Sequence, residues 1–216
     1  MKSILFLSTF LFFFSCSVIA QNIKQFDYGV AFSANLQSLN VKTSDWSANG
    51  INKQLKSIEV TNELGFEIAV ICQYNINKTW SLRSLPAFSF QSSRLHYYFN
   101  NDSKYFRGLE TVEANLPFHL TYTLASEKHI APSFSVGGFV SKMLPPKSRS
   151  NRYWKYDAGL EAGMSLKIKT RKFIVAPELL YSMGLKNLNK LDNTIYTNAI
   201  QKLTRNRFIL RVSFYG

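Results

Sequence analysis

The chain has 216 residues, enough for one domain, and its 26 lysine and arginine residues against 13 acidic ones give a net charge of +13. Hydrophobic residues make up 46% of the sequence and aromatic residues 15%. After residue 20, however, no apolar run approaches the ~20 residues that a membrane-spanning helix needs. The composition therefore excludes spanning helices in this part of the chain.

Residues 1–20 are predicted to be a cleaved signal peptide. Lys2 supplies the positive start, an apolar run covers residues 4–14, and small residues lead to a polar Gln21. Cleavage is expected after Ala20. A retained membrane anchor is the alternative, but the apolar run is shorter than the ~20 residues that span a bilayer.

Cys16 leaves a second alternative open, because a cysteine after a short apolar run can be lipidated instead of removed. The other cysteine is Cys72, so removal of Cys16 leaves no pair for a disulfide framework. Export also argues against nucleic acid as the partner of this basic chain. Lipid headgroups or lipopolysaccharide of an outer membrane are the nearer polyanions.

From residue 26 onward, apolar and polar residues alternate with a period of two. In the first segment Phe26, Tyr28 and Val30 share one face, and Asp27 and Gly29 the other. Seven more segments follow, so that the set is 26–36, 63–74, 80–90, 110–124, 130–140, 153–166, 173–185 and 207–214. Most are ten residues or longer, which suits a tilted membrane-crossing strand of ~9–11 residues better than a soluble strand of ~5–6.

The pattern predicts an all-β fold for residues 21–216: an eight-stranded antiparallel up-and-down transmembrane β-barrel in an outer membrane. The connections alternate in length. Those at 75–79, 125–129 and 167–172 are short, and those at 40–62, 91–109, 141–152 and 186–205 are long. Outer-membrane barrels have short periplasmic turns and long outer loops.

Aromatic residues are expected at both ends of such strands, where rings lie at headgroup level. Seven fall near the short turns: Phe26, Tyr28, Tyr74, Trp80, Tyr122, Phe173 and Phe214. Trp154, Tyr156, Phe88 and Phe90 fall near the other end. The alternative is a soluble, lipocalin-like barrel with the apolar face inward. Its outer coat of Gly, Ser and Thr with few charges would be poor for a soluble protein.

No phosphate-binding, dinucleotide-binding or zinc motif is present, and we expect no catalytic residue, cofactor or metal. His119 lies near mid-strand on the polar face with Thr121 and Thr123. A lipid-modifying Ser/His site would need it near lipid, so a hydrogen-bonded histidine inside the barrel is the favoured interpretation.

Nine charged residues are expected on the face that points into the barrel: Glu63, Glu67, Arg83, Glu113, Asp157, Glu161, Glu178, Arg207 and Arg211. They could form a conducting path or a set of salt bridges. Since side chains alone can fill the interior of eight strands, salt bridges are favoured.

The 186–205 connection is unusually apolar for a loop. Leu188, Leu191, Ile195, Tyr196, Ile200 and Leu203 recur at spacings that suit one face of a short helix. The loop could cap its own barrel or offer a partner a hydrophobic surface. Ile195, Tyr196, Ile200 and Leu203 would then contact the partner.

The sequence from about residue 63 onward resembles the small outer-membrane β-barrel family of the Bacteroidetes, and within it the PorT proteins. The match is strongest in KFIVAPELLYSMGLKNL and NTIYTNAIQKLTRNRFILRVSF, which contain Pro177-Glu178-Leu179 and the stretch 200–203. The resemblance implies a barrel needed for type IX protein secretion and, where present, gliding motility. It brings no catalytic residues.

Two functional hypotheses follow. The chain is either an accessory of the type IX secretion machinery, or a self-contained structural, adhesive or ligand-binding surface barrel. In both cases a monomeric, non-enzymatic barrel in contact with outer-membrane lipid is expected, with secretion-machinery proteins as partners in the first.

Overall fold

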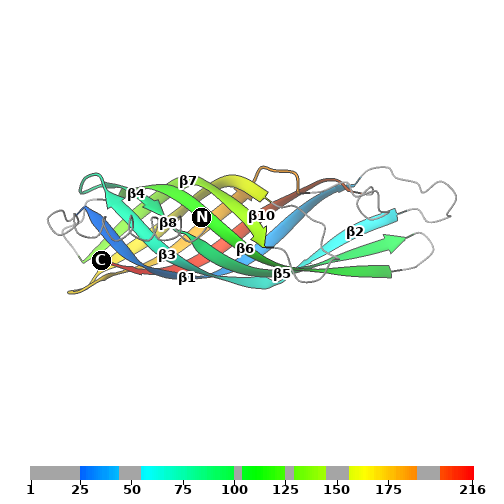
Figure 1. Cartoon of the computed structure of the whole chain (residues 1–216), viewed down its shortest axis with the longest axis horizontal. Helices are drawn as coiled ribbons and strands as arrows, with labels where there is room; N and C mark the ends of the chain where they lie inside the picture. Colours follow the sequence, from blue (N-terminus) through cyan, green and yellow to red (C-terminus); the bar gives the residue numbers. More distant parts are fainter. Residues whose placement is uncertain (1–24, 44–54, 100–103, 125–128, 145–155, 189–199) are drawn as a thin grey trace, which may run out of the picture.

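The computed structural model describes residues 25–43, 55–99, 104–124, 129–144, 156–188 and 200–216. These residues form ten strands in one antiparallel sheet (Figure 1). The strands are β1 (Phe26–Thr43), β2 (Leu55–Asn62), β3 (Leu64–Asn75), β4 (Trp80–Ser84), β5 (Ala87–Phe99), β6 (Lys104–Thr123), β7 (Ile130–Leu144), β8 (Tyr156–Lys169), β9 (Ile174–Gly184) and β10 (Ile200–Tyr215). In the part of the chain described, no helix could cross a membrane. The expected signal peptide, with Cys16, lies outside the described residues.

The sheet closes into a ring of eight strands, because two pairs of strands are each continuous. At the β4–β5 junction the Leu85 N–H donates to the Pro117 carbonyl at 3.2 Å, and the Pro86 carbonyl accepts from the Val70 N–H at 2.9 Å. The ladders on both sides therefore run through the junction. β2 and β3 likewise follow one another along the β4–β5 strand. Since β1 pairs with both β10 and β3, the ring of eight strands is closed, and among the described strands β2 alone is paired on one side only, where it extends beyond the ring.

Apolar side chains cover the outside of this ring and polar side chains fill the inside. On β3, for example, Phe66, Ile68 and Val70 are exposed, whereas Glu67 and Gln73 are buried. Cys72 is also exposed on the outer face. A soluble lipocalin-like barrel would have the opposite arrangement, so that alternative is wrong. The outer surface is suited to hydrocarbon.

A single-residue bulge at Glu63 reverses the alternation between β2 and β3. Phe66 pairs with Phe90 and Asn62 with Ser93, so four steps along β2–β3 face three along β5. Odd-numbered residues of β3 point inward. On β2 the inward residues are even-numbered, because Ile58 and Val60 pack against buried apolar side chains inside the barrel. A bulge shifts one strand relative to its neighbour in this way.

The strands extend further at the long-loop end than the sequence pattern predicted. β1, β2, β5, β6 and β10 include much of the expected loops 40–62, 91–109 and 186–205. Most outward positions described there are polar, as at Asn40, Arg94 and Lys202, and Phe106 is an exposed apolar exception. The apolar alternation that identifies a lipid-facing strand is therefore absent, although the strands continue. In Figure 1 β2 and the ends of β5 and β6 project beyond the barrel at this end.

The aromatic girdle predicted at the short-turn end is confirmed. Its rings are exposed and pack in pairs across neighbouring strands. The ring centroids of Phe26 and Tyr74 are 5.0 Å apart, those of Trp80 and Tyr122 4.8 Å, and those of Phe173 and Phe214 6.5 Å. At the other end Tyr156 is exposed, and Trp154 lies outside the described residues.

Candidate functional site: the filled interior of the barrel

Charged side chains fill the middle of the barrel. Among the described residues, five carboxylates and four arginines inside it are each 3% exposed or less: Glu67, Glu113, Asp157, Glu161, Glu178, Arg83, Arg205, Arg207 and Arg211. They lie in three groups, and each group joins strands from different sides of the ring.

The first group centres on Glu178 of β9. Arg83 Nη1 and Nη2 donate to its two carboxylate oxygens at 2.5 and 3.0 Å, a bidentate arrangement. Arg211 Nη1 lies 3.8 Å from Glu178 Oε2, and Arg211 Nη2 donates to Glu67 Oε1 at 3.2 Å. The chain of contacts runs from β4 through β9 and β10 to β3, across the lumen.

The second group centres on Glu161 of β8. His119 Nε2 lies 2.7 Å from Glu161 Oε2, and Arg207 Nη2 lies 3.4 Å from Glu161 Oε1. Gly137 stands between His119 and Glu161 in the β6–β7–β8 ladder. A Cβ at Gly137 would come within 1.8 Å of the Phe118 carbonyl oxygen. The backbones are therefore in such close contact that only glycine fits. The imidazole is fully buried against a carboxylate inside the barrel, as the favoured interpretation expected.

The third group centres on Arg205 of β10. It forms ion pairs with Glu113 and with Asp157, the latter at 2.9 Å from Nη2, and Nη2 also donates to Ser141 Oγ at 3.3 Å. Sequence reasoning missed Arg205 because it was assigned to the loop. It continues the inward series of Arg207, Ile209 and Arg211, so the period of two could have identified it.

Glu63 is a correction to the predicted network. Its Oε1 lies 2.8 Å from Arg94 Nε, and the two side chains are 32% and 59% exposed. The bulge described above moves Glu63 out of the inward series, so that it pairs with an outward-facing arginine of β5. The other eight predicted residues lie in the interior groups.

An apolar cluster lies above the charged groups at the long-loop end. It consists of Leu39, Leu95, Tyr97, Phe99, Leu188, Ile200 and Leu203. Ile200 and Leu203 are 1% and 0% exposed. The Leu188 N–H donates to the Leu203 carbonyl at 2.7 Å, which ties the segment after β9 to β10.

The predicted helix is therefore wrong at Ile200 and Leu203, which lie in a strand. Lys42 pairs with Lys202 and Thr43 with Ile200, so Gln201 is an extra residue on β10. This bulge brings residues three apart to the same face and so imitates helical spacing. Because the Ile200 and Leu203 side chains are buried, they do not form a hydrophobic surface that a partner protein could contact. Ile195 and Tyr196 lie outside the described residues.

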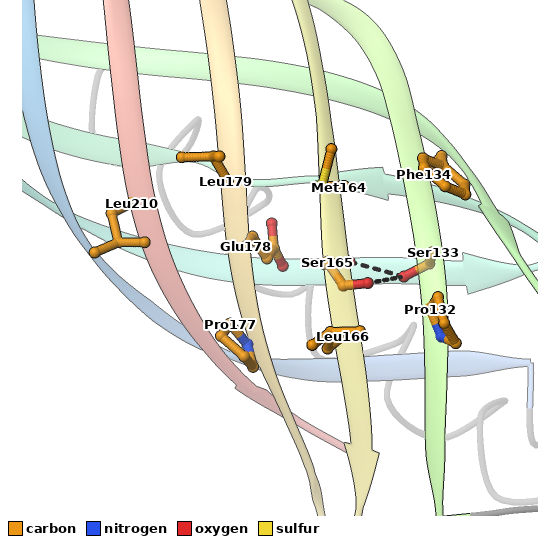
Figure 2. Close-up of a pocket in the computed structure, with 10 residues that line it drawn as sticks. All are labelled: Pro132, Ser133, Phe134, Met164, Ser165, Leu166, Pro177, Glu178, Leu179 and Leu210. Atoms are coloured by element: carbon orange, nitrogen blue, oxygen red, sulfur yellow. Dashed lines mark hydrogen bonds between the residues drawn. The ribbon is translucent and has the colours of Figure 1, made fainter.

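An apolar groove of about 320 Å³ lies on the outer wall, across β7, β8, β9 and β10 (Figure 2). Pro132, Leu166 and Pro177 lie side by side on β7, β8 and β9 in Figure 2. Pro177 has no N–H, and the β8–β9 ladder is interrupted between the Ser165–Glu178 and Ile168–Val175 pairs. Behind the groove the Ser133 and Ser165 hydroxyls lie 2.7 Å apart. The groove is lined on the lipid side by exposed apolar side chains, and Ser133, Ser165 and Glu178 line its inner side.

Within the described ranges, no three histidine, cysteine or acidic side chains gather as a metal site would require. The buried carboxylates contact arginine, histidine, serine and amide groups, and Glu113 Oε2 has no hydrogen-bond partner among the described residues. The chemistry of the interior is thus that of structural ion pairs.

A family model described as "Outer membrane protein beta-barrel domain" matches residues 19–190. Comparison with curated protein sequences gave no match. Among solved structures, the crystal structure of the outer membrane protein OprG from Pseudomonas aeruginosa matches with a TM-score of 0.53 and 10% identity, over 88% of this chain and 94% of that one. Neisserial surface protein A matches with a TM-score of 0.47 and 12% identity, over 87% and 95%. At 10% identity the likeness to OprG shows the fold alone.

Proposed function

The chain belongs to the outer membrane protein β-barrel domain family, and from its filled interior we infer that it acts as a closed, non-enzymatic barrel and not as a pore. It is an outer-membrane protein, with the short turns on the periplasmic side and the long loops outside. Its function would then depend on what binds to its ends and loops.

The observation that carries this proposal is the way the lumen is filled. The three charged groups join opposite walls, and the apolar cluster closes the outer end. Opening a path for ions would require breaking buried ion pairs, and each unpaired charge left behind is costly. An eight-stranded barrel has little interior space beyond its side chains.

We propose further that this barrel is a PorT-like component needed for type IX protein secretion, and for gliding where it occurs. The resemblance to PorT proteins supports this, and its residues have defined places in the fold. Glu178 of Pro177-Glu178-Leu179 holds Arg83, and Ile200 and Leu203 close the outer end of the lumen. The residues of the resemblance therefore coincide with the two features that fill the barrel.

Deletion of the gene followed by comparison of secreted proteins tests the secretion role. Cargo of the type IX pathway should accumulate in the periplasm, and the wild-type chain supplied in trans should restore its release. A general loss of outer-membrane integrity is monitored by leakage of an unrelated periplasmic protein. Unchanged secretion in the deletion strain would contradict the secretion role.

A self-contained surface barrel is the second candidate, and the projecting strands favour it. β2, β5 and β6 extend beyond the apolar band, and Phe106 on β6 is 78% exposed there. An exposed aromatic ring on a projecting strand can bind an external ligand or surface. This candidate predicts normal type IX secretion in the deletion strain together with altered attachment of the cells.

A further inference from the structure

The periplasmic end of the barrel contains a cavity of about 620 Å³ that the three charged groups do not fill. Side chains from six strands line it, among them Asp27 of β1, Gln73 and Asn75 of β3, Ser81 of β4, Thr123 of β6 and Lys167 of β8. It lies among the short turns, within the aromatic girdle. The cavity is therefore accessible from the periplasm.

Lys167 is the one buried lysine among the described residues, and it points into this cavity. Its side chain is 7% exposed, and Nζ donates to Thr123 Oγ1 at 2.9 Å. Each of the four buried arginines has a carboxylate within 4 Å, whereas Lys167 forms no ion pair with a described carboxylate. The carboxylates of Glu178 and Asp27 are close enough to attract this ammonium, but neither forms an ion pair with it. A buried ammonium without a direct partner is costly, so the site favours an anion.

The one acidic residue that lines the cavity already accepts hydrogen bonds from two neighbouring lining residues. Gln73 Nε2 and Asn75 Nδ2 donate to Asp27 Oδ2 at 3.1 and 2.8 Å. Lys78 and Lys169 also line the cavity, so that its lining has three lysines and one carboxylate. The lining is thus cationic as a whole.

Two further polar atoms that line the cavity lack partners. Ser81 Oγ and Gln73 Oε1 are buried and make no hydrogen bond within the described structure. Other buried polar atoms of the interior also lack partners, but these two face a cavity in which a ligand could supply them. Lys167 is the one buried lysine of the lining, and its ammonium and the Ser81 hydroxyl together can hold one carboxylate inside the cavity.

We propose that this cavity binds a small molecule or a chain end that carries one carboxylate and enters from the periplasm. The carboxylate pairs with Lys167 Nζ and accepts a hydrogen bond from the Ser81 hydroxyl. Gln73 Oε1 accepts a hydrogen bond from a donor on the rest of the ligand. This binding does not depend on the proposed role in secretion.

Trp80 lines the cavity, so the part of the tryptophan fluorescence that it contributes, beside Trp46 and Trp154, should respond to binding. The folded full-length mature chain in detergent micelles is titrated with three probes: acetate, N-acetyl-diglycine and the C-terminal amide of the same dipeptide. The two carboxylate probes should change the fluorescence in a saturable way, and the amide should bind about tenfold or more weakly because it lacks the charge. Tighter binding of the dipeptide than of acetate identifies a chain end as the ligand, and the reverse order identifies a free small carboxylate.

Lys167→Met should weaken binding of N-acetyl-diglycine by about tenfold or more. Lys142→Met is the matched control, because Lys142 is an exposed lysine at the other end of neighbouring β7, 5.8 Å from the Tyr156 ring. It should bind like the wild type. If Lys167→Met does not fold, the comparison of acid and amide on the wild-type chain decides. Equal binding of acid and amide, wild-type affinity in Lys167→Met, or no saturable response would each overturn the proposal. Since the purified protein is tested, the result is independent of any secretion defect.

Discussion

At the scale of single residues, the ion pair between Arg83 and Glu178 is expected to be the most sensitive to mutation. Both side chains are 1% exposed and their contact is bidentate. Arg83→Met leaves the Glu178 carboxylate with Arg211 and the Ser213 hydroxyl, neither of which makes a bidentate contact. Loss of one partner of a buried pair costs about 3–5 kcal/mol. Urea unfolding of the barrel in lipid vesicles should show this decrease in the free energy of unfolding.

Two controls separate the charge effect from packing. Arg94→Met removes an exposed pair with Glu63 and should cost less than about 1 kcal/mol. The double variant Arg83→Met, Glu178→Leu removes both charges and should recover much of the lost stability. A single variant as stable as Arg94→Met would show that the pair does not support the fold.

Gly137 provides a second prediction at this scale. A Cβ there would meet the Phe118 carbonyl oxygen at 1.8 Å, whereas a Cβ at Gly108 would meet nothing within 4 Å. Gly137→Ala should therefore lower the free energy of unfolding by roughly 1–3 kcal/mol through overpacking. Gly108→Ala is the control and should leave it nearly unchanged. Equal stability of the two variants would contradict the close contact between β6 and β7.

At the scale of elements, the first residues of β10 are expected to close the outer end of the barrel and so to stabilise the fold. Leu203→Ser removes a fully buried side chain from the apolar cluster and buries a hydroxyl, at a cost of about 2–5 kcal/mol. The variant should accumulate poorly in the membrane and unfold at lower urea concentration. Lys202→Ser on the exposed face of the same strand should behave like the wild type. Normal stability of Leu203→Ser together with a loss of function would favour a contact site instead.

The strands show why sequence predicted some elements and not others. Where one face contacts lipid, as from Phe66 to Val70, strict alternation identifies both the strand and its inner face. The same alternation placed Arg83 and Glu178 on the interior side, where the structure buries them. The extra residues at Glu63 and Gln201 could not be predicted, because a bulge depends on the pairing of two strands and not on one segment alone.

The contacts of the site were beyond sequence reasoning for a related reason. Alternation predicts whether a side chain points into or out of the barrel, but not its position along the barrel axis, because the strands are tilted and staggered. The pairing of Arg83 with Glu178, 95 positions away, depends on the stagger of all the strands between them. For the same reason the cavity around Lys167 could not be predicted, since its lining comes from separate strands.

At the scale of the whole molecule, closure of the sheet should make the protein resistant to SDS. Every strand of the described ring is paired on both sides within the barrel wall, so its backbone hydrogen bonds protect one another. Unboiled membrane samples should migrate at a different position from boiled samples on a gel. Identical mobility would count against a closed barrel.

The central claim is that this outer-membrane barrel is filled and does not conduct. Steady-state conductance of the purified barrel in planar bilayers tests it most directly, with a known porin inserted under the same conditions as the positive control. The Arg83–Glu178 and Arg205–Glu113 pairs join opposite walls, and the contacts of Glu161 link β6, β8 and β10, all below an apolar plug. Inserted barrels should therefore give no steady current above that of the lipid alone. Reproducible unitary currents from the wild-type barrel would contradict the claim.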